Sequence, residues 1–418
     1  MADTAPKVAE PERQESSNVI DRKAETIARL IRESRHFIVF TGAGVSTSAG
    51  ISDFRGPNGA WTLRAQGKVA QNKKSTLQAI PTPTHMALVE LQRRGILTYH
   101  ISQNCDGLHR RSGIPPNKIS ELHGNSNREY CQDCEREYLR DFRAVSTYEN
   151  SIHDHRTGRK CAVCGGDLLD TIINFGENLW EEPIRLAREH AEKADLCIVL
   201  GSSLTVTPAN EIPEPVGMRR GAHLVICNLQ STPKDHLCDI RVFAKGDDLM
   251  TRVMAKLNIP IPKFILQRRL VIETQNNDGR PKLTVKGVDI DGIPATFLRA
   301  VKLDYNRRLI RSEPFVFTLR NSPDVGTQLK FELEFMGHYG EPNLEVVYEY
   351  QEEGDTEAFY SLEYDPENGT WAINQVETFG LQDQAPDRTP KRDRVVLDLI
   401  GDESPPEGIL SSPATNAL

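Results

Sequence analysis

A glycine-rich segment directly after an apolar run is the feature that most constrains how this chain can fold. Residues 41–56 read TGAGVSTSAGISDFRG and follow the apolar run Phe37–Phe40. The glycines of GAG let a backbone approach a phosphate closely, and a helix starting near Ser46 and Thr47 would direct its N-terminal amides at an anion. The third glycine comes late, at Gly50, so the spacing departs from G-x-G-x-x-G. Alone, the segment fits a dinucleotide loop or a plain tight turn equally well.

Further apolar runs of strand length point to a parallel sheet. They lie at Ile96–Ile101, Asp195–Leu200 and Ala222–Cys227, and small or polar residues follow each one at once. Near-continuous apolar strands are typical of a parallel sheet covered on both faces. Ligands bind at the carboxyl ends of such strands, so the loops should share one crevice. The sequence therefore predicts a doubly wound α/β domain that binds a dinucleotide.

Two C-x-x-C pairs predict a four-cysteine zinc site inserted in this domain. The pairs are Cys131 with Cys134 and Cys161 with Cys164. Four thiolates complete a tetrahedral zinc and leave no open position, so the ion would be structural. A disulfide pair and a redox C-x-x-C are the alternatives. The sequence has no signal peptide or membrane-length apolar span, which favours a reducing compartment and a protein that is not secreted.

The chain is long enough for more than one core, and its pattern changes near residue 263. We expect a disordered N-terminal tail over 1–19 and the α/β domain over 20–262, with the zinc module at about 125–170. Over 265–378 we expect a β-rich domain, because β-branched and aromatic residues alternate there between turn signals, and the strand spacing favours an antiparallel sandwich. Its expected strands are 269–274, 282–288, 315–319, 329–335 and 344–350. A disordered tail should occupy 382–418.

Charge narrows the choice of partners. The net charge of −8 disfavours generic duplex DNA binding, because that affinity comes from a basic face. Direct binding of other nucleic acids stays open. Residues 341–387 contain many acidic residues and no lysine or arginine. They could attract a basic partner such as a histone tail, or they could form a solvated acidic face.

Several motifs together resemble the sirtuins, NAD-dependent protein lysine deacylases. In addition to the glycine loop, SQNCDGLH begins at Ser102, ELHG at Glu121, GSSL at Gly201 and NLQ at Asn228. The resemblance covers about residues 20–261. The PNGAW loop, HRTGRKCAVCG and NLQSTPKD are similar to the class IV branch, nearer its sirtuin-seven subgroup than its sirtuin-six subgroup. The resemblance implies an acylated protein lysine as substrate, and nicotinamide, deacylated lysine and O-acyl-ADP-ribose as products.

The same resemblance assigns the site residues. His123 would remove a ribose hydroxyl proton, which suits an imidazole whose pKa lies near working pH. Asn104 would organise the ribose and a water, and Asp106 would bind the nicotinamide carboxamide. The remaining NAD contacts would be Gly42, Ala43, Gly44, Thr47, Asp53, Phe54, Arg55, Trp61, Gln103, Gly201, Ser202, Ser203, Asn228, Leu229, Gln230 and Gly246. Phe175, Gly176, Glu177, Leu204, Thr205 and Val206 would clamp an extended peptide as an added strand.

Four other residues are of interest for the chemistry. His109 competes with His123 but more naturally orders its loop. Cys105 lies in the expected active-site loop and could be oxidisable. Asn174 departs from the bulky apolar residue that many sirtuins carry, which leaves the acyl preference open. Cys197 lies in an apolar strand and should be inert.

Three functions remain in competition. The first is a deacylase acting on histone tails or other nuclear proteins. The second is a mono-ADP-ribosyltransferase that uses the same site. The third is a non-catalytic reader of NAD or acyl-lysine, although a base at the ribose would be superfluous there. A nuclear location follows by analogy with the family, a cytoplasmic one is the alternative, and no membrane partner is expected.

Overall fold

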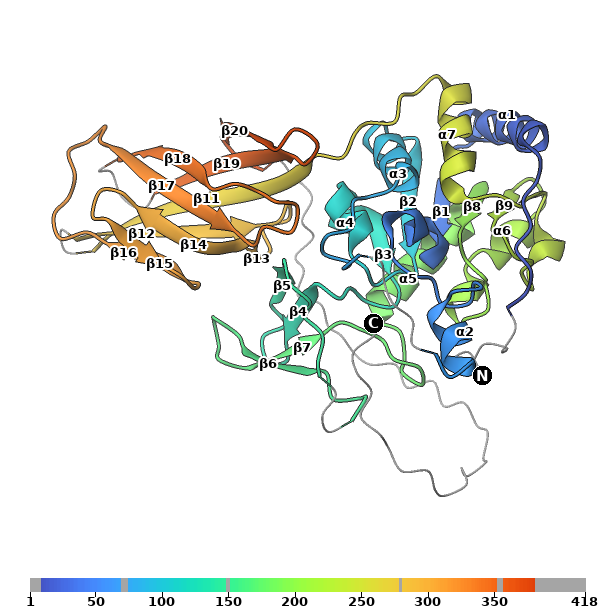
Figure 1. The fold of residues 1–418 in the computed structure, drawn as a ribbon, viewed down its shortest axis with the longest axis horizontal. Helices are drawn as coiled ribbons and strands as arrows, with labels where there is room; N and C mark the ends of the chain where they lie inside the picture. The colour runs from blue at the N-terminus through green and yellow to red at the C-terminus, as the bar shows by residue number, and fades with distance from the viewer. Residues whose placement is uncertain (1–8, 69–73, 148–150, 278–279, 352–355, 380–418) are drawn as a thin grey trace.

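The computed structural model describes residues 9–68, 74–147, 151–277, 280–351 and 356–379. Residues 1–8 of the expected N-terminal tail and the whole expected C-terminal tail, 382–418, lie outside these residues. The described chain forms an α/β domain, a zinc-module sheet and a C-terminal β domain, and the β domain lies at the opposite end of the molecule from α1 (Figure 1). The α1 helix begins at Ser17, and Arg13 and Glu15 donate backbone hydrogen bonds to Leu229 and Phe243. Order therefore begins earlier than the expected boundary at residue 19.

The α/β domain is built on a six-stranded sheet in the order β10-β9-β8-β1-β2-β3, and all its pairs are parallel. Its strands are β1 (Phe37–Thr41), β2 (Leu97–Ser102), β3 (Ile119–Glu121), β8 (Leu196–Leu200), β9 (His223–Cys227) and β10 (Ile240–Val242). Both faces are buried, which explains why these strands read as continuous apolar runs. The predicted doubly wound α/β fold is confirmed.

Helices cover the two faces of this sheet. The helices α1 (Ser17–Glu33), α3 (Pro83–Arg93) and α7 (Gly246–Leu257) pack on one face, and α5 (Glu181–Lys193) and α6 (Glu214–Met218) pack on the other. In α1, Ile20, Ala24 and Ile27 fall at helical spacing and are buried. Thr82 caps α3 by accepting from the backbone of His85. The shorter helices are α2 (Ala60–Ala65) and α4 (Leu108–Ser112).

The glycine loop differs from expectation in one respect. After β1 the chain forms a 3-10 helix, η1 (Ala43–Ala49), rather than an α-helix capped by Ser46 or Thr47. The Ser46 hydroxyl instead donates to Asp106 at 2.6 Å. A Cβ on Gly42 or Gly44 would lie 2.7 Å from backbone atoms of Gly201. Both glycines are therefore needed for the close approach of two loops, apart from any ligand.

The zinc module is a small sheet that receives a strand from the C-terminal domain. Its own strands are β4 (Arg128–Cys131), β5 (Glu137–Arg140), β6 (Arg156–Lys160) and β7 (Asp167–Asp170). A two-residue strand, β13 (Ala295–Thr296), extends the sheet by pairing in parallel with β5. The module and the C-terminal domain are thus joined by backbone hydrogen bonds.

The C-terminal domain consists of two antiparallel sheets that share one core. The five-stranded sheet holds β16 (Phe315–Thr318), β12 (Arg280–Val288), β11 (Leu266–Asn277), β19 (Thr356–Asp365) and β20 (Thr370–Val376). The four-stranded sheet holds β15 (Arg308–Ile310), β14 (Leu298–Leu303), β17 (Gln328–Phe335) and β18 (Leu344–Glu349). Buried side chains from both sheets form one cluster that includes Phe317 and Phe331. The alternation of residues in the sequence predicted five of these strands. It did not predict β14, β15, β19 or β20.

Among the described residues, no helix is both long enough and apolar enough to cross a lipid bilayer.

Candidate functional site

A cleft of about 540 Å³ opens at the carboxyl ends of the parallel strands. It brings together most of the residues expected at the site from the sequence. These are Gly42, Ala43, Gly44, Asp53, Phe54, Arg55, Trp61, Gln103, Asn104, His123, Phe175, Gly176, Glu177, Gly201, Ser202, Ser203, Val206, Asn228 and Gln230. Polar loops from distant parts of the chain therefore meet in one crevice, as expected for this topology.

Six expected site residues do not line the cleft: Thr47, Asp106, Leu204, Thr205, Leu229 and Gly246. Gly246 instead begins α7, where a Cβ would lie 3.1 Å from the Thr84 hydroxyl oxygen. Leu204 is buried, and Asn210 donates to its carbonyl. These two positions support the walls of the cleft.

His123 lies just after β3 and faces the cleft with one nitrogen unused by its backbone contact. Its Nδ1–H donates to the carbonyl of Gln103 at 3.0 Å. A carbonyl can only accept, so the neutral ring carries its proton on Nδ1 and keeps a lone pair on Nε2. Burial lowers the pKa of His123, the hydrogen bond to Gln103 opposes this, and the positive charge of Arg55 lowers it further. The ring is thus held in the form that can accept a proton.

Asn104 and Asp106 follow β2 but face different surroundings. The Asn104 amide donates to the carbonyl of Gly42 at 3.1 Å, which joins the β2 loop to the glycine loop. Asp106 accepts from the Ser46 hydroxyl and, at 2.9 Å, from the backbone N–H of Leu108. Its carboxylate therefore fixes the glycine loop to the start of α4, and this residue does not line the cleft.

The far end of the cleft carries polar side chains suited to a nucleotide. The Ser202 hydroxyl donates to the Gln103 side-chain carbonyl at 2.8 Å, and the Asn228 amide donates to the Gln230 carbonyl at 3.0 Å. The Gln103 Nε2 is buried and, within the described part of the chain, has no hydrogen-bond partner. Such a donor is costly unless a ligand satisfies it. A ribose hydroxyl is a suitable acceptor, so the residues present fit a dinucleotide.

An aromatic group forms the wall after the glycine loop. The rings of Phe54 and Trp61 stack with centroids 5.9 Å apart, and Trp61 meets Phe175 at the same distance. Arg55 lies beside them, and burial lowers the pKa of its guanidinium. A partly desolvated cation and a set of rings could bind phosphate and exclude water from a reacting carbon.

The four predicted zinc ligands converge at one point. The sulfur atoms of Cys131, Cys134, Cys161 and Cys164 all lie within 4.8 Å of one another. The Cys131–Cys164 and Cys134–Cys161 sulfur pairs are 3.4 and 3.6 Å apart. Tetrahedral zinc with bonds of about 2.3 Å requires sulfurs roughly 3.8 Å apart, so the cluster fits this ion. Tyr138 lies 3.1 Å from the Cys161 sulfur and can donate to a thiolate there.

Cys105 lines the cleft, but its surroundings disfavour the reactivity expected from the sequence. Its sulfur contacts the carbonyl of His123 at 3.2 Å, and burial raises the pKa of the thiol to about 12. The negative charge of Asp106 adds to this effect. Since the thiolate is the form that reacts, Cys105 should resist oxidation. His109 is likewise occupied, because its Nε2 hydrogen-bonds the Thr41 hydroxyl at 3.0 Å.

Sequence reasoning missed several apolar residues of the cleft. Ile152, Ile172, Ile173 and Leu179 line it on the side of the peptide segment. Ile152 comes from the zinc module, and no local sequence pattern connects it to the strands of the α/β domain.

Comparison with known proteins identifies the relatives of the chain. Residues 68–208 match the family model described as Sir2 family. The "NAD-dependent protein deacetylase SRT1" of Arabidopsis thaliana is 39% identical over 336 residues, which cover 76% of this chain and 69% of that protein. The human "NAD-dependent protein deacetylase sirtuin-7" is 41% identical over 251 residues, covering 58% and 62%. The Drosophila melanogaster "NAD-dependent protein deacetylase Sirt6" is 36% identical over 260 residues, covering 61% and 81%. A solved structure described as "Sir2-p53 peptide-NAD+" is 34% identical and covers 56% of this chain and 98% of its own, with a TM-score of 0.45.

Proposed function

This chain belongs to the Sir2 family, and from that membership we propose that it is an NAD-dependent protein lysine deacylase. Its curated relatives are named NAD-dependent protein deacetylases. The observation that carries the proposal is the state of His123, which keeps a lone pair on Nε2 and lines the same cleft as the glycine loop. A cleft that only bound a dinucleotide would not need a base there.

Each residue of the cleft has its own role in this reaction. NAD supplies a ribose carbon that can exchange nicotinamide for the oxygen of an acyl group. His123 takes a proton from a ribose hydroxyl at Nε2. Gln103 holds the ribose through its unused amide hydrogens, and Asn104 keeps the β2 loop against the glycine loop. Phe54 and Trp61 exclude water, and Arg55 offers a cation to phosphate.

We place the acylated lysine on the opposite side of the cleft. Phe175, Gly176 and Val206 line that side. An extended peptide could add there as a strand, through main-chain hydrogen bonds that demand little of its sequence. By analogy with its sirtuin-seven relatives we propose nuclear proteins, histone tails among them, as substrates. The acidic segment after Glu341 is a second surface that a basic tail could use.

Mass spectrometry of the full chain with NAD and acetyl-, succinyl- or myristoyl-lysine histone peptides tests the proposal. We expect loss of one acyl mass from a peptide and appearance of O-acyl-ADP-ribose, both absent without NAD and in His123→Ala. An ADP-ribose mass gained by protein, with the acyl group untouched, would instead establish the transferase. Full activity of His123→Ala would remove this residue from the mechanism.

A further inference from the structure

A short loop of the zinc module reaches the peptide side of the cleft. We call residues 151–155, which precede β6, the histidine loop because they include His153 and His155. Ile152 in this loop lines the cleft although 55% of its surface is exposed. It lines the cleft together with Ile172, Ile173 and Phe175. An apolar side chain left open at a cleft wall is suited to contact an apolar part of a ligand.

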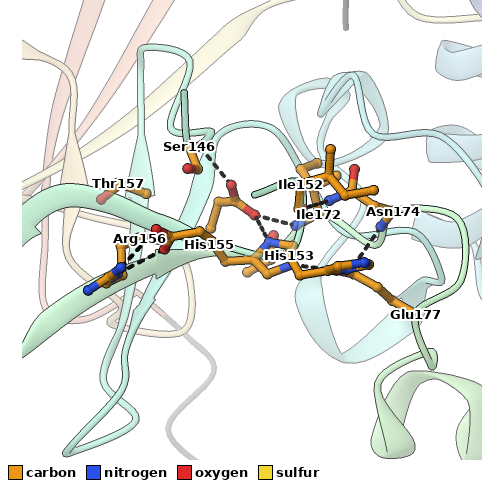
Figure 2. Close-up of polar contacts among 12 residues, drawn as sticks. Ser146, Ile152, His153, His155, Arg156, Thr157, Ile172, Asn174 and Glu177 are labelled. Atoms are coloured by element: carbon orange, nitrogen blue, oxygen red, sulfur yellow. Dashed lines mark hydrogen bonds and ion pairs between the residues drawn. The ribbon is translucent and has the colours of Figure 1, made fainter. Parts of the chain in front are cut away.

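His155 holds this loop between two carboxylates (Figure 2). Its Nδ1 lies 2.8 Å from Asp170, and its Nε2 lies 2.9 Å from Glu177. Hydrogen bonds to Asp170 and then Glu177 raise the pKa of His155 to about 9, and burial opposes them. The ring is therefore protonated near neutral pH and donates from both nitrogens. His153 adds a third contact, with its Nδ1 2.7 Å from the same Glu177 oxygen.

Further hydrogen bonds connect Glu177 back to the histidine loop, so that the contacts form a closed network. The second Glu177 oxygen accepts from the backbone N–H of Asn174 at 2.8 Å. The Asn174 side chain in turn donates to the carbonyl of Ile152 at 2.8 Å. Figure 2 shows Ile152 and His153 beside Asn174 and Glu177, with dashed lines for the contacts between them. The Glu177 carboxylate therefore fixes the position of its own segment, whereas the expected clamping of peptide as an added strand would use the main chain.

Asp170 connects the other end of this closed network of contacts to the rest of the zinc module. It is buried at the end of β7 and accepts from the backbone N–H groups of Ile172, at 3.1 Å, and Ser146, at 2.7 Å. Ile172 is itself a cleft residue. The histidine loop is thus fixed to a strand on one side and to the expected peptide segment on the other.

We propose that the histidine loop is part of the acyl-lysine site. In this arrangement His155 is a positioning residue that fixes segment 174–177, and Ile152 is a specificity residue that limits the length of the acyl chain. The inference rests on the proposed deacylase function. It gives the zinc module a direct part in substrate choice, in addition to its structural role.

Steady-state kinetics of the full chain with acetyl- and myristoyl-lysine peptides tests both roles. His155→Ala should raise KM for peptide about tenfold, because charged hydrogen bonds that position the segment are lost, while KM for NAD stays within about twofold. Ile152→Ala should raise the ratio of kcat/KM for myristoyl over acetyl peptide about fivefold, because removing the side chain enlarges the part of the cleft that would hold the acyl chain. His236→Ala, at an exposed histidine away from the cleft, should match wild type.

The outcomes separate this inference from the proposed function. If wild type deacylates but Ile152→Ala keeps the wild-type acyl ratio and His155→Ala keeps KM for peptide, the inference is wrong and the function stands. If His155→Ala fails to fold, Glu177→Gln tests the positioning role instead. This variant retains an acceptor for Asn174 but loses the negative charge that faces both histidines. An unchanged KM for peptide in Glu177→Gln would then overturn the positioning role. If wild type releases no nicotinamide with any acylated peptide, the proposed function itself fails.

Discussion

At the scale of single residues, the protonation state of His123 determines how activity should depend on pH. Burial lowers its pKa from the ordinary 6.5, so the neutral form that accepts a proton persists at a lower pH than in an exposed histidine. We predict that the acid limb of kcat/KM for NAD has its midpoint below 6.5, and that His123→Ala loses at least about a hundredfold in kcat. A pH–rate profile measures both. A midpoint above 7 would show that another group controls the acid limb.

Motifs in the sequence identified many of these residues but not their partners. His123 and Gln103 could be predicted because each directly follows a strand that carries a recognisable motif. The contacts of Glu177 with His153 and His155 could not be predicted, because the two histidines come from a segment with neither helical nor strand periodicity. Cys105 was predicted to be oxidisable from its loop position alone, whereas the pKa of its thiol depends on burial by chain segments that are distant in sequence.

At the scale of elements, the zinc module combines a four-cysteine cluster that fits zinc with a strand from another domain. Cys161→Ala removes one of four thiolates, so we predict loss of bound zinc and a lower melting temperature. Because β5 pairs with both β4 and β13, protection from hydrogen exchange should fall as well at the amides of Leu139 and Asp141, which donate to the carbonyls of Pro294 and Thr296. Metal analysis and exchange mass spectrometry measure these effects. A zinc-free variant that keeps its wild-type melting temperature and activity would contradict a structural role for the ion.

The periodicity of the strands explains which elements were predictable. The strands of the parallel sheet are buried on both faces and give unmistakable apolar runs. The strands β12 and β17 alternate buried and exposed residues and were also found. The β20 strand lies at a sheet edge with few buried residues, and β13 has only two residues. Such elements form because their neighbours supply pairing, a signal that lies outside their own sequence.

At the scale of the whole molecule, buried ion pairs join the C-terminal domain to the rest. Asp289 pairs with Arg110 of α4, and Arg268 donates to Asp141 at 2.7 Å. The side chain of Arg110 is only 9% exposed, so Asp289→Ala would leave a buried cation without its carboxylate. We predict a loss of about 3–5 kcal/mol in unfolding free energy, measured by denaturant titration. Asp304→Ala, which removes an exposed partner of Lys302, should leave the unfolding free energy close to that of wild type. If Asp289→Ala changes the unfolding free energy as little as Asp304→Ala does, the interface pair does not stabilise the molecule.

We propose above all that this cleft couples cleavage of NAD to removal of an acyl group from lysine. One time course that follows both nicotinamide and deacylated peptide tests it most directly, with acetyl-lysine peptide and full-length protein. We predict that the two products appear in equal amounts and that neither forms when NAD or the acyl group is left out. Nicotinamide released without any loss of acyl groups would contradict it.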